Sequence, residues 1–127
     1  MATRFQVTFD AAEPRRLAEF WALALGYQQQ APPERWDDHG WLVDPDGVGA
    51  RLFFQRVPEP KTAKNRVHLD LHVSGERGTP PQERRRRIDA EAARLVAAGA
   101  TRIAAHDEPD QYWVVLQDPE GNEFCLD

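Results

Sequence analysis

The chain has 127 residues, 41% of them hydrophobic, which suits one compact domain and is too small for two independent domains of usual size. The formal net charge of -5 argues against the phosphate-driven nucleic-acid binding that a basic surface supports. The single cysteine, Cys125, excludes an internal disulfide or a multi-cysteine zinc site. With no signal-peptide pattern and no long uncharged apolar stretch, we expect a cytoplasmic protein with no membrane partner.

The first half of the chain predicts the element order β-α-β-β-β. Residues 5–9 alternate apolar and polar side chains, which is the period of a half-buried strand. A helix with one apolar stripe follows, from Pro14 to a stop at Gly26. Three short strands are then expected at 27–30, 41–43 and 51–57, the last two joined by an Asp-Pro-Asp-Gly turn at Asp44–Gly47.

The same order recurs after a Pro-led polar linker at 58–65. A strand is expected at 67–73, and a helix from a capping box at Thr79–Gln82 to Gly99. The arginine run at 84–87, with acidic neighbours, indicates a solvated helix face rather than an anion-binding patch. The last three strands are expected at 101–104, 112–117 and 124–126, with a second Asp-Pro-acid-Gly turn at Asp118–Gly121.

The repeat predicts an α+β fold. A single domain at 1–127 is expected to consist of two βαβββ modules, at about 3–57 and 66–127. These modules are expected to form a curved, mainly antiparallel eight-stranded cup with a helix packed on each module. A ligand would bind inside the cup.

Polar side chains on the first strand of each module are the first candidates for a site. His68, Asp70 and His72 alternate with apolar residues, so they project from one strand face about 7 Å apart. Asp70 is expected to orient or charge-pair a histidine. The repeat puts Gln6 at the position of His68. His72 is expected to be structural, and His39 and His106 to lie in loops.

Aromatic side chains in the hairpin strands are candidates for a ligand-binding wall. Trp36, Trp41 and Trp113, with Phe53, would suit a flat or partly apolar organic ligand, and sheet packing is the alternative. An inward Arg51 would bind a carboxylate or phosphate, whereas an outward one is only a strand arginine. Cys125 lies between two apolar residues and is expected to line the site as a small buried side chain rather than a nucleophile.

This repeated pattern resembles the vicinal oxygen chelate superfamily, which includes glyoxalase I, extradiol dioxygenases, bleomycin-resistance proteins and glyoxalase-like domains. Its strongest carriers are the helix end at Phe20–Tyr27 and the turn at Asp118–Asn122. The resemblance extends from Phe5 to Leu126 and implies a small-molecule site. Enzymes of the superfamily hold one divalent metal with four side chains from the first and last strands of each half.

The resemblance implies that Gln6 and His68 occupy the first-strand ligand positions. The last-strand ligand, commonly a Glu four residues after the turn Gly, falls at Cys125 in the second half and at Arg51 or Phe53 in the first. Arg51 and Phe53 have no metal-binding atom, so the usual set is incomplete.

Glu123 lies two residues before Cys125 on the same strand face. It gives an alternative ligand set, Gln6, His68 and Glu123, for one Zn, Ni, Mn or Fe ion. The other alternative is that no metal binds.

Two functions follow from the resemblance. An enzyme would use metal-assisted lyase or isomerase chemistry on a small organic molecule, with His68 and Glu123 as its catalytic proton-transfer groups. A non-catalytic protein of the bleomycin-resistance type would instead sequester an organic anion or an aromatic molecule without a metal. Similar proteins are often homodimers, and we expect the same here.

Overall fold

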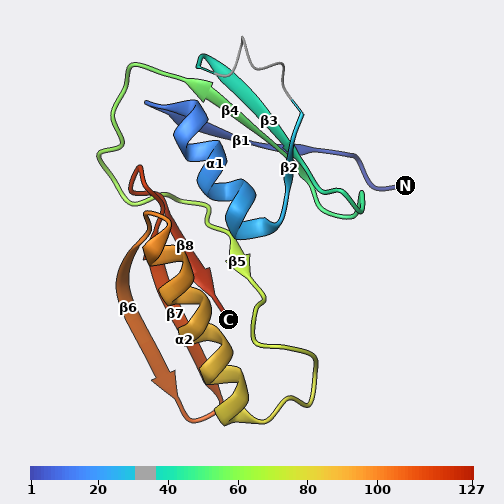
Figure 1. The fold of residues 1–127 in the computed structure, drawn as a ribbon, viewed down its shortest axis with the longest axis vertical. Helices are drawn as coiled ribbons and strands as arrows, with labels where there is room; N and C mark the ends of the chain where they lie inside the picture. Colours follow the sequence, from blue (N-terminus) through green and yellow to red (C-terminus); the bar gives the residue numbers. More distant parts are fainter. Residues whose placement is uncertain (31–36) are drawn as a thin grey trace. The chain divides into compact units, whose positions relative to one another are not determined.

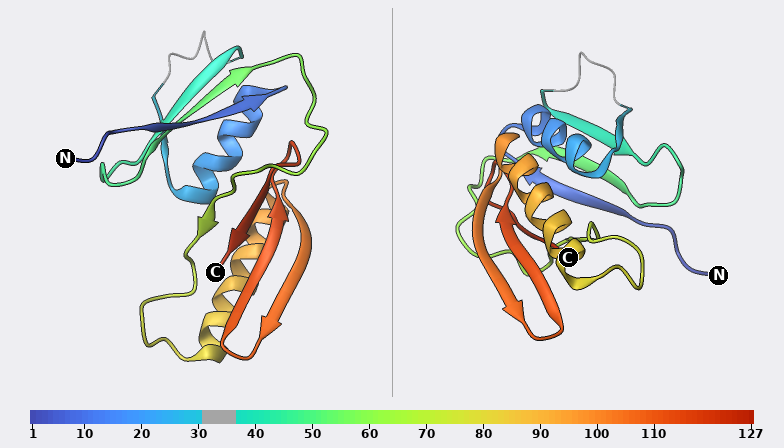
Figure 2. Two further views of the ribbon diagram at one scale, coloured as in Figure 1. Left: turned by 180° about the vertical axis from the view of Figure 1, so that it is seen from behind. Right: turned by 60° about the horizontal axis from the view of Figure 1, so that its bottom comes forward.

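The computed structural model describes residues 1–30 and 37–127 (Figure 1), so the candidate Trp36 lies outside the described residues. The chain divides into two compact units, Met1–Pro60 and Lys61–Asp127. The boundary lies inside the segment at 58–65 that the sequence predicts as a linker. Each unit contains one four-stranded sheet and one long helix (Figures 1 and 2).

Both units have the predicted βαβββ order, so the α+β fold class is confirmed. The first unit consists of β1 (Gln6–Ala11), α1 (Pro14–Leu25), β2 (Gln28–Gln29), β3 (His39–Val43) and β4 (Arg51–Arg56). The second consists of β5 (Asp70–Leu71), α2 (Pro81–Ala97), β6 (Thr101–Glu108), β7 (Gln111–Gln117) and β8 (Glu123–Leu126).

The two sheets share one topology. Their strand orders are β1-β4-β3-β2 and β5-β8-β7-β6. In each sheet the first strand pairs in parallel with the last, and the other pairs are antiparallel. The first strand of each unit therefore lies beside the strand that follows its Asp-Pro-acid-Gly turn.

Strand alternation separates a helix-facing side from an open side in each sheet. In the first unit the Trp21 ring of α1 packs on Phe9, which stacks on Phe54. The buried apolar side chains of the second unit are Leu71, Ile88, Ala92, Leu95, Ala100, Val114, Leu116, Phe124 and Leu126. On the strands of both units, the side chains that alternate with buried apolar positions point to the open side. All the candidate site residues on strands are among them.

The two repeated turns have the same hydrogen-bond pattern. The amide of Gly47 donates to the Asp44 carbonyl at 3.0 Å, and that of Gly121 to the Asp118 carbonyl at 2.9 Å. Both glycines have positive φ, 71° and 85°, which glycine adopts at little cost. The carboxylates of Asp44 and Asp118 accept further amide hydrogen bonds inside their turns. The two predicted turns are confirmed.

The predicted capping box at the start of α2 is wrong. The helix has Pro80 at its N-cap and no side-chain cap, and the Thr79 hydroxyl donates to the Glu76 carbonyl at 2.7 Å. The helix therefore begins one residue later than predicted, at an N-cap proline with no side-chain acceptor for the free helix amides, and Thr79 stabilises the preceding turn instead.

Four strand predictions also differ from the structure. β5 is only Asp70–Leu71, although the Val73 amide still donates to the Asp127 carbonyl at 2.8 Å. β6 extends four residues beyond the predicted end at 104, so it includes His106. His39 likewise lies in β3 and not in a loop. Phe5 lies outside β1 and is 73% exposed.

None of the helices in the described part of the chain is both long and apolar enough to cross a membrane.

Candidate functional site

Three side chains of the second unit, His68, Asp70 and Cys125, form what we call the donor group. One ligand atom from each, the imidazole nitrogen, a carboxylate oxygen and the sulfur, lies within 4.8 Å of the other two. Asp70 and Cys125 are partners in the parallel pairing of β5 with β8. Nε2 of His68 lies 3.1 Å from Oδ1 of Asp70, which agrees with the expected charge-pairing of these neighbours.

The donor group is accessible from outside. The side chains of His68 and Asp70 are 46% and 48% exposed, and Cys125 is half-buried. Burial raises the pKa of the Cys125 thiol, and the charge and hydrogen bond of Asp70 raise it further, with a smaller contribution from Asp127. Cys125 is therefore a neutral thiol at neutral pH, which argues against a nucleophilic role in the metal-free protein.

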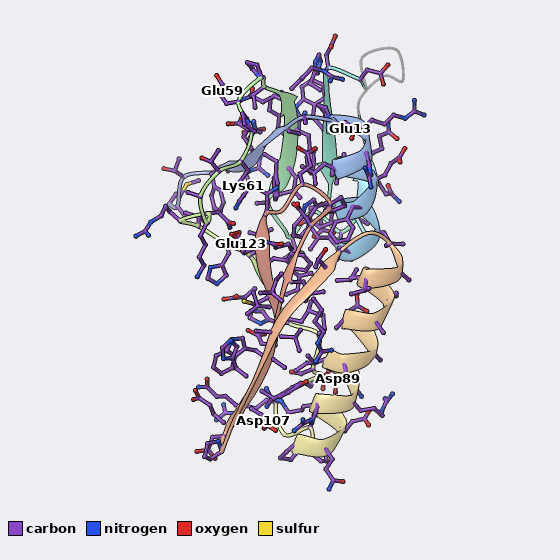
Figure 3. All side chains as sticks on the ribbon, turned by 90° about the vertical axis from the view of Figure 1, so that its left-hand side faces the viewer. Glu13, Glu59, Lys61, Asp89, Asp107 and Glu123 are labelled. Atoms are coloured by element: carbon purple, nitrogen blue, oxygen red, sulfur yellow. The ribbon has the colours of Figure 1, made fainter. Side chains whose placement is uncertain are left out.

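Glu123 begins β8 on the same face as Cys125, but it has its own partners. Lys61 Nζ lies 3.0 Å from Glu123 Oε1, and these two side chains are only 25% and 12% exposed. Figure 3 labels both residues, close together near the start of β8. The side chain of Asn65 makes two hydrogen bonds to the backbone of Glu123. It accepts one from the amide at 2.8 Å and donates one to the carbonyl at 3.1 Å.

The environment of Glu123 favours its charged form. Burial raises its pKa, but the hydrogen bond and charge of Lys61 together with backbone amides outweigh burial, and the net shift is downward. Its second carboxylate oxygen, Oε2, is buried and has no hydrogen-bond partner among the described residues. Glu123 is thus a carboxylate with one unused acceptor atom.

The predicted metal set is divided between the two units. Gln6 lies on the open face of the first sheet, opposite Arg51 in β4, whereas His68 and Glu123 belong to the second unit. Within the second unit, His68 is grouped with Asp70 and Cys125. His72 lies outside this group, with its Nδ1 2.5 Å from Oδ1 of Asp127, and this contact raises its pKa.

A pocket of about 820 Å³ in the second unit includes the donor group in its lining. The rest of the lining comes from the start of α2, with Arg84 and Arg85, and from the tip of the β6–β7 hairpin, with Tyr112 and Trp113. β8 pairs with β7 only from Val114 to Gln117. The hairpin end of β7 is therefore not covered by β8, which leaves space for the pocket.

A side-chain network holds the hairpin against α2. The Arg85 guanidinium pairs with Asp107 and lies over the Tyr112 ring at 4.5 Å. The Tyr112 hydroxyl donates to Asp89 at 2.5 Å. Asp89 and Asp107 are labelled beside α2 in Figure 3. Arg85 thus positions one wall of the pocket, a role that the prediction of a solvated arginine face missed.

The open face of the first sheet carries an aromatic cluster of His39, Trp41 and Phe53. Trp41 and Phe53 stack with ring centroids 5.1 Å apart, and the His39 ring meets Trp41 edge-on at 5.1 Å. The guanidinium carbon of Arg51 lies 5.2 Å from the centre of the Trp41 ring. In the second sheet the His106 ring stacks on Trp113 at 4.7 Å.

Sequence reasoning missed His39 and His106 as neighbours of these aromatic side chains. His39 precedes Trp41 by two residues, which places both on one strand face, so period-two alternation could have found it. His106 is the cross-strand partner of Trp113 in the β6–β7 hairpin, a pairing that follows only once the hairpin register is known. No sequence signal connects Lys61, in the linker, with Glu123.

Comparison with known proteins identifies the family. The sequence model of a family described as a glyoxalase-like domain matches residues 6–126. Curated protein sequences give no match to the chain.

Several solved structures have the same fold. A glyoxalase/bleomycin resistance protein/dioxygenase family enzyme from Burkholderia phytofirmans is 19% identical, with a TM-score of 0.70 over 95% of this chain and 94% of that one. A fosfomycin resistance protein from Listeria monocytogenes, complexed with Mn(II) and a dihydroxypropylphosphonic acid, is 8% identical (TM-score 0.71, covering 99% and 89%). A bleomycin-binding protein from Streptomyces verticillus, complexed with copper(II)-bleomycin, is 16% identical (TM-score 0.59, covering 99% and 95%).

Proposed function

The chain belongs to the glyoxalase-like domain family of the vicinal oxygen chelate superfamily, and from this premise we propose that it binds a small organic molecule at the donor group of its second module. One observation carries the proposal: a nitrogen, an oxygen and a sulfur donor converge in the lining of a pocket large enough for such a molecule.

The donor group fits a divalent metal ion. Ligand atoms bound tetrahedrally to one zinc ion at about 2.0–2.3 Å lie roughly 3.3–3.8 Å apart. The three atoms of the donor group lie within 4.8 Å of one another, so a small inward movement of these side chains would let them share one ion. A thiolate, an imidazole and a carboxylate suit zinc better than magnesium or calcium. A metal ion bound by three protein ligands would polarise oxygen atoms of the organic molecule at an open position. One structural relative was solved with Mn(II) and an organic phosphonic acid, which supports this proposal.

In a lyase or isomerase, Glu123 would transfer protons, and His68 would do so only in an enzyme whose metal ion it does not bind, because a metal-bound imidazole has no free lone pair to accept a proton. The lowered pKa of Glu123 keeps it charged at neutral pH, so it would accept a proton and not donate one. Its unpartnered Oε2 is an atom that could accept that proton. The neutral Cys125 thiol would lose its own proton on binding a metal.

A metal-free binding protein is the second candidate function. It is favoured because the side chains of the donor group already interact with one another without an ion. Asp70 pairs with His68, and its charge and hydrogen bond raise the pKa of Cys125. In this case Trp113 and the other pocket residues would hold an organic molecule without an ion.

Metal content separates the two candidates. Protein purified without chelator and then titrated with zinc or cobalt should hold one ion per chain, and binding should be lost in His68→Ala and Cys125→Ser. His72→Ala is the matched control because His72 lies outside the donor group. In the cobalt-substituted protein, a thiolate-to-metal absorption band should disappear in Cys125→Ser. If no stoichiometric ion binds, or if all three variants bind it equally well, the metal-dependent function is refuted and the metal-free candidate remains.

We also propose, by analogy with similar proteins, that the chain forms a homodimer. Sedimentation equilibrium over a range of protein concentrations tests this, and a monomer mass at all of them would refute it.

A further inference from the structure

The aromatic cluster of the first module presents large rings on the side of the sheet opposite the helix. A sheet face that only meets water usually carries small or polar side chains. Here His39, Trp41 and Phe53 contact one another there and remain half-buried. Mutual ring contacts cover only part of these side chains, so an apolar surface is left for a planar molecule.

Arg51 supplies a positive charge at the edge of this surface. Its guanidinium lies over Trp41, and no acidic side chain of the described residues forms an ion pair with it. A cation–π contact limits the freedom of the guanidinium and uses none of its hydrogen-bond donors. The fork of donors is therefore free to bind a carboxylate.

The neighbours of Arg51 are compatible with an anion. Gln6 is its partner in the β1–β4 pairing and is exposed, so its amide can donate to the same ligand. Asp10, on the same face of β1, is roughly 13 Å further along the strand. That carboxylate also has a partner of its own, because Gln55 donates to it at 2.8 Å. Screening at physiological salt further weakens its effect at Arg51.

We propose that the open face of the first sheet binds an aromatic carboxylate, with its ring on the aromatic cluster and its acid group on Arg51. This inference goes beyond the proposed function, which concerns the donor group of the second module, and names a ligand class for the first module. It uses none of the residues of the donor group, so each idea can fail without the other.

The test uses three small probes: 2-naphthoate, its neutral isostere 2-naphthamide, and cyclohexanecarboxylate. Calorimetric titration should show that 2-naphthoate binds more tightly than both, because only it offers a ring and a charge together. In Arg51→Gln, affinity for 2-naphthoate should fall by roughly tenfold, to the level of the amide. Arg51→Lys keeps the charge without the fork and should lie between them.

Arg77→Gln is the matched control, since it removes the same charge from an exposed arginine in the second module. The indole N–H signals of a ¹⁵N-labelled sample locate the probe, with Trp41→Phe assigning the Trp41 signal. The same spectra show whether each variant is folded.

Equal affinity for 2-naphthoate and 2-naphthamide in the unaltered protein would overturn the inference. So would an equal weakening by Arg51→Gln and Arg77→Gln, or a probe that shifts the Trp113 indole and not that of Trp41. A protein that binds metal at the donor group but ignores 2-naphthoate would refute this inference alone. Binding of 2-naphthoate by protein that holds no metal would support this inference and leave the donor-group proposal to be decided by the metal titration.

Discussion

The carboxylate of Asp70 and the thiol of Cys125 face one another across the parallel β5–β8 pair. Burial is the largest cause of the raised pKa of Cys125, and the charge and hydrogen bond of Asp70 come next. Burial and Asp70 together keep the sulfur protonated at neutral pH, and a metal ion bound there would displace that proton.

Replacing Asp70 by Asn should make Cys125 more reactive. The substitution removes a negative charge beside the sulfur, so the pKa of the thiol falls and more thiolate is present at a given pH. The rate of alkylation by iodoacetamide, followed by mass spectrometry from neutral to alkaline pH, should rise and its pH profile should move to lower pH. Asp127→Asn should move the pH profile less, because the charge of Asp127 raises the pKa of Cys125 less than that of Asp70 does. An unchanged profile in Asp70→Asn would show that burial alone protects the thiol.

Gly49→Ala should destabilise the first module. A Cβ at this position would overlap the Tyr27 hydroxyl oxygen and lie 3.2 Å from Cζ of the same ring. Overpacking of this kind costs about 1–3 kcal/mol of unfolding free energy. Urea denaturation of the variant measures the loss.

The same substitution in a Tyr27→Phe background is the control. With the hydroxyl removed, only the tight approach to Cζ remains, so Gly49→Ala should cost less there than in the unaltered protein. An equal cost in both backgrounds would mean that Tyr27 is not the obstacle.

Lys61 and Glu123 should be coupled energetically. Lys61→Met leaves a largely buried carboxylate without its cation, so the pKa of Glu123 should rise, because burial is then opposed only by backbone amides. We expect a loss of about 1–3 kcal/mol of unfolding free energy at neutral pH.

A double-mutant cycle with Glu123→Gln measures the coupling. Because Gln carries no charge, Lys61→Met should cost much less in the Glu123→Gln protein. Additive costs would indicate that the hydrogen bond of Lys61 to the Ala63 carbonyl, and not the ion pair, is the main interaction of this lysine.

The contribution of Glu83 to stability should depend on pH. Hydrogen bonds from Arg86 and then Arg87 lower the pKa of Glu83 from 4.5 to about 2 in the folded protein. Because the folded pKa is depressed, the stabilisation is fully present above the unfolded pKa and is lost as pH falls through the folded value.

Thermal melts of the protein and of Glu83→Gln across this acid range test the sign. The unaltered protein should melt higher near neutral pH, and the difference should shrink as pH falls from 4.5 towards 2. A difference that stays constant over this window would mean that the carboxylate charge is not what stabilises the start of α2.

Local sequence patterns were sufficient to predict most of the fold. Alternation in β1 and β7, the stripe of α1 and the two Asp-Pro-acid-Gly turns each follow from a few neighbouring residues, so they could be predicted one element at a time. The capping box failed because the helix begins one residue later than predicted, at an N-cap proline with no side-chain acceptor.

The candidate site was predictable only where its residues are near in sequence. His68 and Asp70 are two residues apart, and the alternation expected at 67–73 places them on one face, although β5 itself begins only at Asp70. Cys125 joins them through a parallel register between segments 55 residues apart, which no local pattern specifies. The pairing of Lys61 with Glu123 depends on the path of the linker, for which the sequence has no periodic signal.

The parallel pairing of β5 with β8 also bears on the order of folding. His68 and Asp70 stand at the start of the second module, and Cys125 comes only after α2 and two further strands have been added. Contacts between such distant segments form late, because the intervening chain must first be ordered. The three donor atoms therefore come together only when the module is complete. An ion that needs all three donor atoms would bind only the native state and stabilise it by mass action. The free energy of unfolding should then rise with zinc concentration, and this rise would depend on the pairing of β5 with β8.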